Sequence, residues 1–140
     1  MPTAKEFTLT MDDRPGTLGK VCRALADRNV NIVAAQSFPS GGKSVTRLVF
    51  DDPTKARSVL DGERVSYTET DVVKVKLAHR PGELARAAEK LGDASININH
   101  LYCGAEPSTN APLVIFAVAD VGKAAPLVEQ AAAAGAAGRG

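Results

Sequence analysis

The strongest constraint on the fold of this 140-residue chain is an internal duplication. Residues 7–37 align with residues 73–103 at a constant shift of 66, with eight identities in 31 positions and no gap. The identical residues of the first copy are Arg14, Pro15, Gly16, Leu18, Leu25, Asp27, Asn31 and Ile32. A repeat of this length is typical of two small units with the same fold.

Each copy has the same predicted order of elements. Apolar and polar residues alternate in Phe7–Met11 and in Val73–Leu77, which predicts strands with one buried face. Helical spacing of apolar residues follows each Arg-Pro-Gly turn, and two further β-rich stretches come after it. Asp52 before Pro53 predicts the start of a second helix. We therefore expect an α+β fold of two ferredoxin-like βαββαβ repeats, with antiparallel sheets and the helices on one face.

The domain boundaries follow from the same alignment. We place the first repeat at residues 1–70, the second at residues 71–130, and an Ala/Gly-rich tail at residues 131–140. The tail has no β-branched residues and no alternation, so the second repeat is expected to lack its last strand. The first strand of that repeat would then lie at an open sheet edge. Pro126 stands inside the last predicted helix, where it would delay or kink the helix.

The composition excludes several classes of function. The net charge of +1 offers no basic surface for nucleic acid, and 4% aromatic residues without Trp argue against base stacking. There is no apolar run of 18 residues and no signal peptide pattern. Cys22 and Cys103 are too few for a disulfide framework or a zinc site. We therefore expect a cytoplasmic protein without a nucleic-acid or membrane partner.

The two Arg-Pro-Gly turns are candidate ligand sites. Glycine tolerates the close approach of another group, and the first amides of the following helix can bind a carboxylate. Asparagine side chains at the start of the next strand can donate and accept hydrogen bonds, as an amino-acid zwitterion requires. The candidates are Asp13, Arg14, Gly16, Leu18, Asn31 and Ile32 in the first copy, and His79, Arg80, Gly82, Leu84, Asn97 and Asn99 in the second. Since His79 stands where the first copy has an aspartate, the two sites need not be equivalent.

Each candidate also has a purely structural explanation. The fold itself requires a tight turn, an asparagine can cap the turn before a strand, and both arginines can face solvent or a partner protein. Cys22 lies on an apolar helix stripe, which predicts a small core residue. His100 and Cys103 are three residues apart on a predicted strand and so face opposite sides. We expect no metal, no cofactor and no catalytic residue.

The segment Asp13-Arg14-Pro15-Gly16-Thr17-Leu18, followed by Asn31-Ile32, resembles the ACT domain, and the segment His79–Leu84, followed by Asn97-Ile98, repeats it. The resemblance covers residues 5–70 and 71–130. It implies a non-catalytic tandem ACT protein that binds an amino acid, or a similar small metabolite, at the seam between ACT domains. It also implies a homodimer that signals to a metabolic enzyme or regulator. The alternative is a ligand-free interaction or dimerisation module that acts on such a partner.

Overall fold

The computed structural model of the chain describes residues 2–107 and 110–137. This part of the chain contains six strands and four helices. In chain order the elements are β1 (Thr3–Asp12), α1 (Thr17–Asp27), β2 (Ile32–Ser40), β3 (Lys43–Phe50), α2 (Pro53–Gly62), β4 (Ser66–Lys76), α3 (Glu83–Asp93), β5 (Ile98–Gly104), β6 (Leu113–Val118) and α4 (Val121–Ala137). They divide into two compact units, which we call the first unit (residues 5–70) and the second unit (residues 71–140 with residues 1–4).

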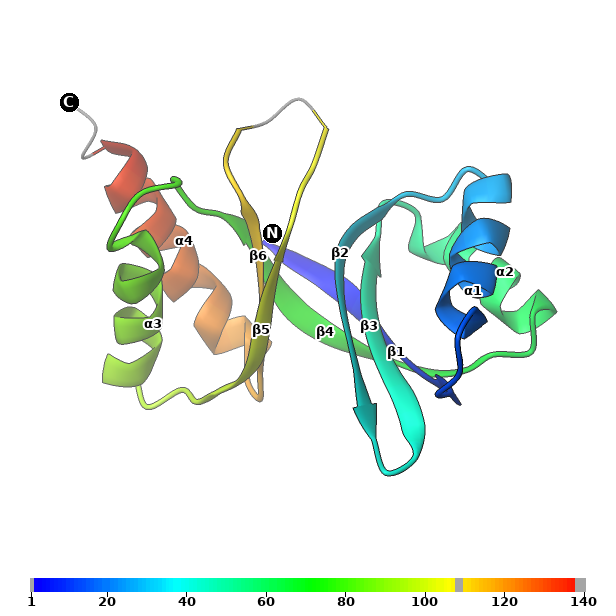
Figure 1. Cartoon of the computed structure of the whole chain (residues 1–140). Coiled ribbons are helices and arrows are strands. Elements are labelled where there is room, and N and C mark those ends of the chain that lie inside the picture. The colour runs from blue at the N-terminus through cyan, green and yellow to red at the C-terminus, as the bar shows by residue number, and fades with distance from the viewer. Residues whose placement is uncertain (1, 108–109, 138–140) are drawn as a thin grey trace. The chain divides into compact units, whose positions relative to one another are not determined.

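The first unit is a sheet with two helices on one face (Figure 1). β3 pairs with β1 on one side and with β2 on the other, and both pairings are antiparallel. The apolar residues that alternate along β1, Phe7, Leu9 and Met11, are buried and pack with Leu25 of α1 and Leu60 of α2. The apolar residues that recur with a period of two in the sequence thus lie on the face of the sheet that the helices cover.

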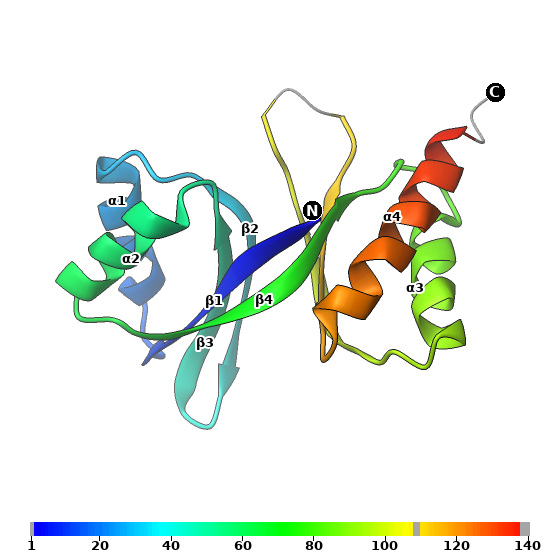
Figure 2. The same ribbon diagram turned by 180° about the vertical axis from the view of Figure 1, so that it is seen from behind.

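The second unit has the same arrangement, seen from behind in Figure 2. β6 pairs antiparallel with β4 and with β5, and α3 and α4 cover one face. All six residues of β6 are buried. The core packs Phe116 of β6 against Leu91 of α3 and Val128 of α4.

β4 is one continuous strand, although the sequence predicts two strands at residues 65–70 and 73–77. Its first half belongs to the first unit, where Tyr67 packs on Phe7 with ring centroids 5.6 Å apart. Its second half belongs to the second unit, where Val73 to Lys76 pair with β6. The segment between the two halves contains no Gly and no Pro, so no residue there ends the strand.

The beginning of β1 lies beside the second half of β4. The backbone N–H of Lys74 donates to the carbonyl of Pro2 at 2.9 Å, and residues 1–4 belong to the second unit. The sequence predicts an open edge at the first strand of the second repeat, whereas Pro2 lies at that edge beside Lys74. The alignment of the two copies begins at residue 7, so it carries no information about the residues before it.

α4 includes most of the segment that the sequence analysis treated as a tail. The helix continues to Ala137, because alanine has the highest helix propensity, and no strand follows it up to that residue. Residues 138–140 lie outside the described residues. Pro126 is exposed and lies inside the helix without ending it.

The shift of 66 residues recurs in the backbone geometry of the two units. Gly16 and Gly82 precede α1 and α3 with φ of +90° and +92°. Asn29 and Ser95 follow the same two helices, both with φ of 60°. Only glycine adopts a φ near +90° at low cost, which explains why a glycine precedes both helices.

Candidate functional site

The two Arg-Pro-Gly turns make the same hydrogen bond. The N–H of Thr17 donates to the carbonyl of Arg14 at 3.3 Å, and the N–H of Glu83 donates to the carbonyl of Arg80 at 3.4 Å. Within the described residues no side chain caps the start of either following helix. Each turn therefore ends at a helix start whose first amides are not used by a capping side chain.

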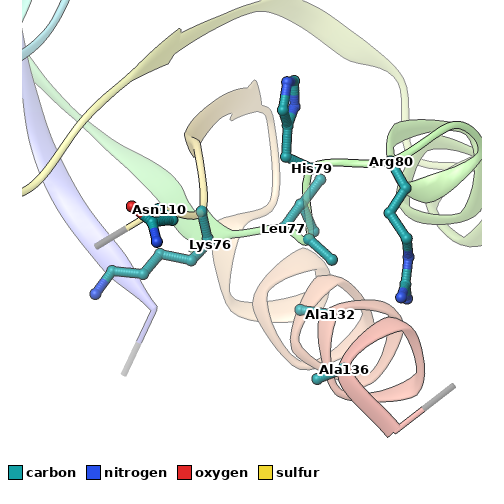
Figure 3. Close-up of a pocket in the computed structure, with 9 residues that line it drawn as sticks. Lys76, Leu77, His79, Arg80, Asn110, Ala132 and Ala136 are labelled. Atoms are coloured by element: carbon teal, nitrogen blue, oxygen red, sulfur yellow. The ribbon is translucent and has the colours of Figure 1, made fainter. Parts of the chain in front are cut away.

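A cavity of about 440 Å³ lies beside the turn of the second unit (Figure 3). The end of β4, the turn, the loop before β6 and α4 form its walls. The lining residues are Lys76, Leu77, Ala78, His79, Arg80, Asn110, Ala111, Ala132 and Ala136. The described lining thus combines basic side chains with small apolar ones and contains no Asp or Glu.

Glu106, in the loop between β5 and β6, neutralises part of this positive charge. Its carboxylate lies 2.9 Å from the Nζ atom of Lys76 and 3.5 Å from that of Lys74. The hydrogen bond from Lys76, together with the charges of both lysines, holds the pKa of Glu106 below its ordinary value. Two lysines of β4 therefore share one ionised carboxylate.

The Arg80 side chain joins the turn to α4. Its guanidinium donates to the carbonyl of Gly135 and lies 3.6 Å from the carboxylate of Glu83. Glu83 is buried, and it also lies 3.3 Å from Arg86. A Cβ atom at Gly135 would collide with the Glu83 carboxylate, so a larger residue there would require the Glu83 side chain to move. These contacts hold the last turns of α4 against the Arg-Pro-Gly turn.

A second cavity of about 350 Å³ lies beside the turn of the first unit. Asp12, Arg14 and Lys20 line it, together with residues 63–66 after α2. Asp12 lies 3.1 Å from Lys43 and 3.3 Å from Arg14. The hydrogen bond from Lys43 and the two positive charges hold the pKa of Asp12 below its ordinary value. Charges of both signs line this cavity, in contrast to the cavity of the second unit.

Three of the predicted site residues line a cavity: Arg14 in the first unit, and His79 and Arg80 in the second. The other residues of the turns and helix starts are Asp13, Gly16, Leu18, Gly82 and Leu84, and none of them is in the described lining. Leu18 and Leu84, at equivalent positions, are 38% and 43% exposed.

The structure does not bring Asn31 and Ile32 to the turn of their own unit. Ile32 pairs with Phe50, whereas Asp12, just before the turn, pairs with Lys43 at the other end of β3. At roughly 3.3 Å per residue, the two positions are about 23 Å apart. The backbone N–H of Asn31 donates to the Asp51 carboxylate at 2.9 Å.

Asn97 and Asn99 occupy the corresponding position of the second unit. Both are exposed, and the Asn97 side chain donates to that of Asn99 at 3.3 Å. Neither residue is in the described lining of the cavity beside Arg80.

The sequence analysis missed most of the lining that does not belong to the turn. Lys76, Asn110, Ala111, Ala132 and Ala136 were not candidates. The spacing of four between the two alanines places them on one face of a helix, but the segment was treated as a tail. A second signal in the sequence was the pair Lys74 and Lys76, which alternate with apolar residues on a predicted strand and so pointed to a basic surface beside the turn.

Cysteine chemistry does not contribute to either site. Cys22 is half-buried rather than in the core, and burial raises the pKa of its thiol, which disfavours the reactive thiolate. Cys103 is exposed on β5. Among residues 2–107 and 110–137 no group of three or more His, Cys, Asp or Glu side chains could hold a metal ion. No helix in the same residues is long and apolar enough to cross a membrane.

Residues 6–61 match the family model of the ACT domain. Over 63 residues the chain is 38% identical to the ACT domain-containing protein ACR3 of Arabidopsis thaliana. The match covers 45% of this chain and 14% of the Arabidopsis protein, so the chain spans a small part of that relative.

Solved structures extend the similarity of the fold to almost the whole chain. Protein BT0572 from Bacteroides thetaiotaomicron superposes with a TM-score of 0.81 at 24% identity, covering 92% of this chain and 88% of that one. The regulatory subunit of aspartate kinase from Thermus thermophilus, in its ligand-free form, superposes with a TM-score of 0.63 at 17% identity, covering 93% and 92%. The chain therefore has the α+β fold of these proteins.

Proposed function

We propose that this chain is a tandem pair of ACT domains, each of ferredoxin-like layout, that binds an amino acid or a similar small metabolite. It acts in the cytoplasm as a non-catalytic module and reports the ligand to a metabolic enzyme or regulator. The ACT match at residues 6–61 and the likeness to an aspartate kinase regulatory subunit support this proposal.

The observation that carries the proposal is the repeated turn with a cavity beside it. Both units have the arginine, the positive-φ glycine and the uncapped helix start in the same geometry, and each turn borders a cavity of a few hundred cubic ångströms. Cavities of this size suit small metabolites. Cationic side chains and helix-start amides that no side chain caps are suited to a carboxylate, which every amino acid carries.

The candidate residues divide into two groups within this proposal. The first group comprises the turn and helix-start residues Asp13, Arg14, Gly16, Leu18, His79, Arg80, Gly82 and Leu84. The second comprises Asn31, Ile32, Asn97 and Asn99, at the starts of the second strands. Because the turn and Asn31 of the first unit are about 23 Å apart, a ligand that contacts both kinds of residue must lie between two ACT domains. We propose that a homodimer supplies the second domain.

A ligand-free interaction module is the second candidate. Leu18 and Leu84 are exposed at equivalent positions of two helices, and Phe38 is 39% exposed on β2. A contiguous apolar patch is typical of a surface that binds a protein partner, and this candidate requires these side chains to form one.

Isothermal titration calorimetry of the full chain with each of the twenty amino acids tests the proposal. We expect one chemical class of amino acid to bind. Arg14→Gln and Arg80→Gln remove the same charge from equivalent turns, so each variant should weaken binding at its own site and lower the measured stoichiometry. If none of the amino acids binds at millimolar concentration, the sensor function is wrong and the interaction module is favoured.

A further inference from the structure

We propose that the second unit closes its own ligand site. The Glu83 carboxylate and the end of α4 hold Arg80, so a ligand carboxylate binds to this arginine only by displacing them. The inference rests on the proposed function, because it takes the two turns as carboxylate sites, and it adds the regulation of one of them. The turn of the first unit is left open in the described residues, so it binds the ligand first.

Arg80, the cation of the second turn, is already engaged inside the protein. Its guanidinium donates to the carbonyl of Gly135 and lies 3.6 Å from the Glu83 carboxylate, which also lies 3.3 Å from Arg86. The Arg80 side chain extends towards the last turns of α4, whereas His79 points away from that helix (Figure 3). A ligand carboxylate would therefore compete with Glu83 for the same guanidinium.

Burial distinguishes this ion pair from the one at the first turn. The side chain of Glu83 is 6% exposed and that of Arg80 is 33% exposed. In the first-turn pair, Asp12 and Arg14 are 54% and 73% exposed. Water screens an exposed pair, so a ligand displaces Asp12 from Arg14 at little cost. Displacing Glu83 from Arg80 leaves a buried carboxylate with one cation fewer, which costs much more.

The residue at the start of the following helix is a second difference between the turns. Glu83 stands where the first unit has Thr17, and the first turn of α1 contains no acidic residue. A carboxylate near a helix start is stabilised by the positive end of the helix dipole, as a bound ligand carboxylate is. The second unit therefore supplies from its own sequence the anion that the first unit would receive from a ligand.

The length of α4 explains why only the second turn is covered by a helix end. α2 and α4 begin alike, since Asp52 and Asp120 each accept from the backbone N–H three residues further on, at 3.0 Å. α2 ends at Gly62, whereas α4 continues to Ala137. At the residue equivalent to Gly135 the first unit has already entered β4, so no helix carbonyl is available there to hold Arg14.

The inference is tested on the full chain with acetate as the probe, because acetate carries a carboxylate and little else. Two-dimensional ¹H–¹⁵N NMR follows the backbone amides of residues 16–18 and 82–84 separately during the titration. Sodium chloride at the same ionic strength is the reference. In the wild-type protein we expect the first-turn amides to report an acetate Kd at least about tenfold lower than the second-turn amides.

Two variants open the second turn by different means. Glu83→Gln removes the competing charge and keeps the shape, and its control, Glu89→Gln, removes the same charge from an exposed position of α3. Gly135→Ala places a methyl group against the Glu83 carboxylate, whereas its control, Gly122→Ala, adds a methyl group to α4 with an ordinary contact of 3.7 Å to Asp120. We expect both opening variants to lower the acetate Kd of the second turn about tenfold, and both controls to resemble wild type. Gly135→Ala decides the question if Glu83→Gln does not fold.

The outcomes separate this inference from the proposed function. Equal Kd values at the two turns of the wild-type protein would overturn the inference, and so would opening variants whose second turn binds acetate no better. Amino acids that bind in calorimetry at two equal sites per chain would overturn it too and leave the sensor function standing. If acetate moves the amides of neither turn, the inference is wrong, and calorimetry with amino acids alone decides the sensor function.

Discussion

A single side chain, Arg57 of α2, joins three elements of the first unit. Its guanidinium donates two hydrogen bonds to the Glu69 carboxylate of β4, at 2.7 and 2.8 Å, and lies 5.7 Å from the ring centroid of Phe7 in β1. Two parallel bonds from one guanidinium are stronger than a single ion pair at the surface. These hydrogen bonds are the main reason why the pKa of Glu69 lies below its ordinary value.

Replacing Arg57 by methionine is expected to raise the pKa of Glu69 towards its ordinary value of about 4.3. A lowered folded-state pKa means that the pair stabilises the fold above that pH and ceases to do so as the pH falls through the folded value. Wild type should therefore be more stable than Arg57→Met at pH 7, and the difference should shrink as the pH falls through the folded-state pKa of Glu69. Carboxyl NMR titration, and urea unfolding at pH 7 and at acidic pH, measure these effects.

Arg23→Met is the matched control for this prediction. Arg23 lies 3.9 Å from Asp27 one turn along α1, and both side chains are mostly exposed. Such a pair contributes little to stability, so the control should unfold like wild type at both pH values. An unchanged Glu69 pKa in Arg57→Met would show that the pair does not form.

At the scale of helices and strands, local signals in the sequence predict most of the fold. The alternation in Phe7–Met11 and the Asp-Pro start of α2 correspond to observed elements, and Asp52 caps that helix by accepting from the N–H of Lys55 at 3.0 Å. The continuity of β4 and the hydrogen bond between Pro2 and Lys74 were missed, because they depend on partners far away in the chain. For the same reason the candidate site was predicted only in part. The turn is a local motif, whereas α4 supplies part of the cavity wall from about fifty residues further along the chain.

Replacing Pro126 by alanine is expected to stabilise the protein by about 1–3 kcal/mol. Proline inside α4 has no N–H for the carbonyl of Gly122, and its ring crowds that carbonyl. Its side chain is exposed, so alanine loses no core packing. Thermal and urea unfolding measure the gain, and far-UV circular dichroism should show no loss of helix.

Pro53→Ala provides the comparison for Pro126. Pro53 stands at the first position of α2, where the missing N–H has no intrahelical partner to lose. We expect no gain in stability there. If both substitutions stabilise equally, the effect of Pro126 does not come from its position inside the helix.

At the scale of the whole molecule, strands rather than a linker connect the two units along the chain. β1 and β4 each contribute residues to both units, and the chain passes between the units within regular strand structure. The second unit is therefore discontinuous, since it uses residues at the beginning of the chain as well as residues 71–140.

Deleting residues 2–4 is expected to destabilise the second unit and to open the edge of β4. The deletion removes the Pro2 carbonyl that accepts the hydrogen bond from Lys74, and an exposed strand edge pairs readily with another chain. We expect a lower unfolding midpoint in urea and self-association in size-exclusion chromatography with light scattering. Pro2→Ala keeps the backbone carbonyl and should resemble wild type. Wild-type behaviour of the deletion variant would show that the pairing adds nothing to stability.

The pairing of Pro2 with Lys74 also sets an order of events during synthesis. At roughly 5–20 residues per second, a ribosome needs about 4 to 15 seconds to add the residues that separate the two. The first unit is complete once Thr70 has been added, only four residues before Lys74, and until Lys74 is made the Pro2 carbonyl has no native partner. Pro2 is therefore made before the whole of the first unit but reaches its native neighbour only after it.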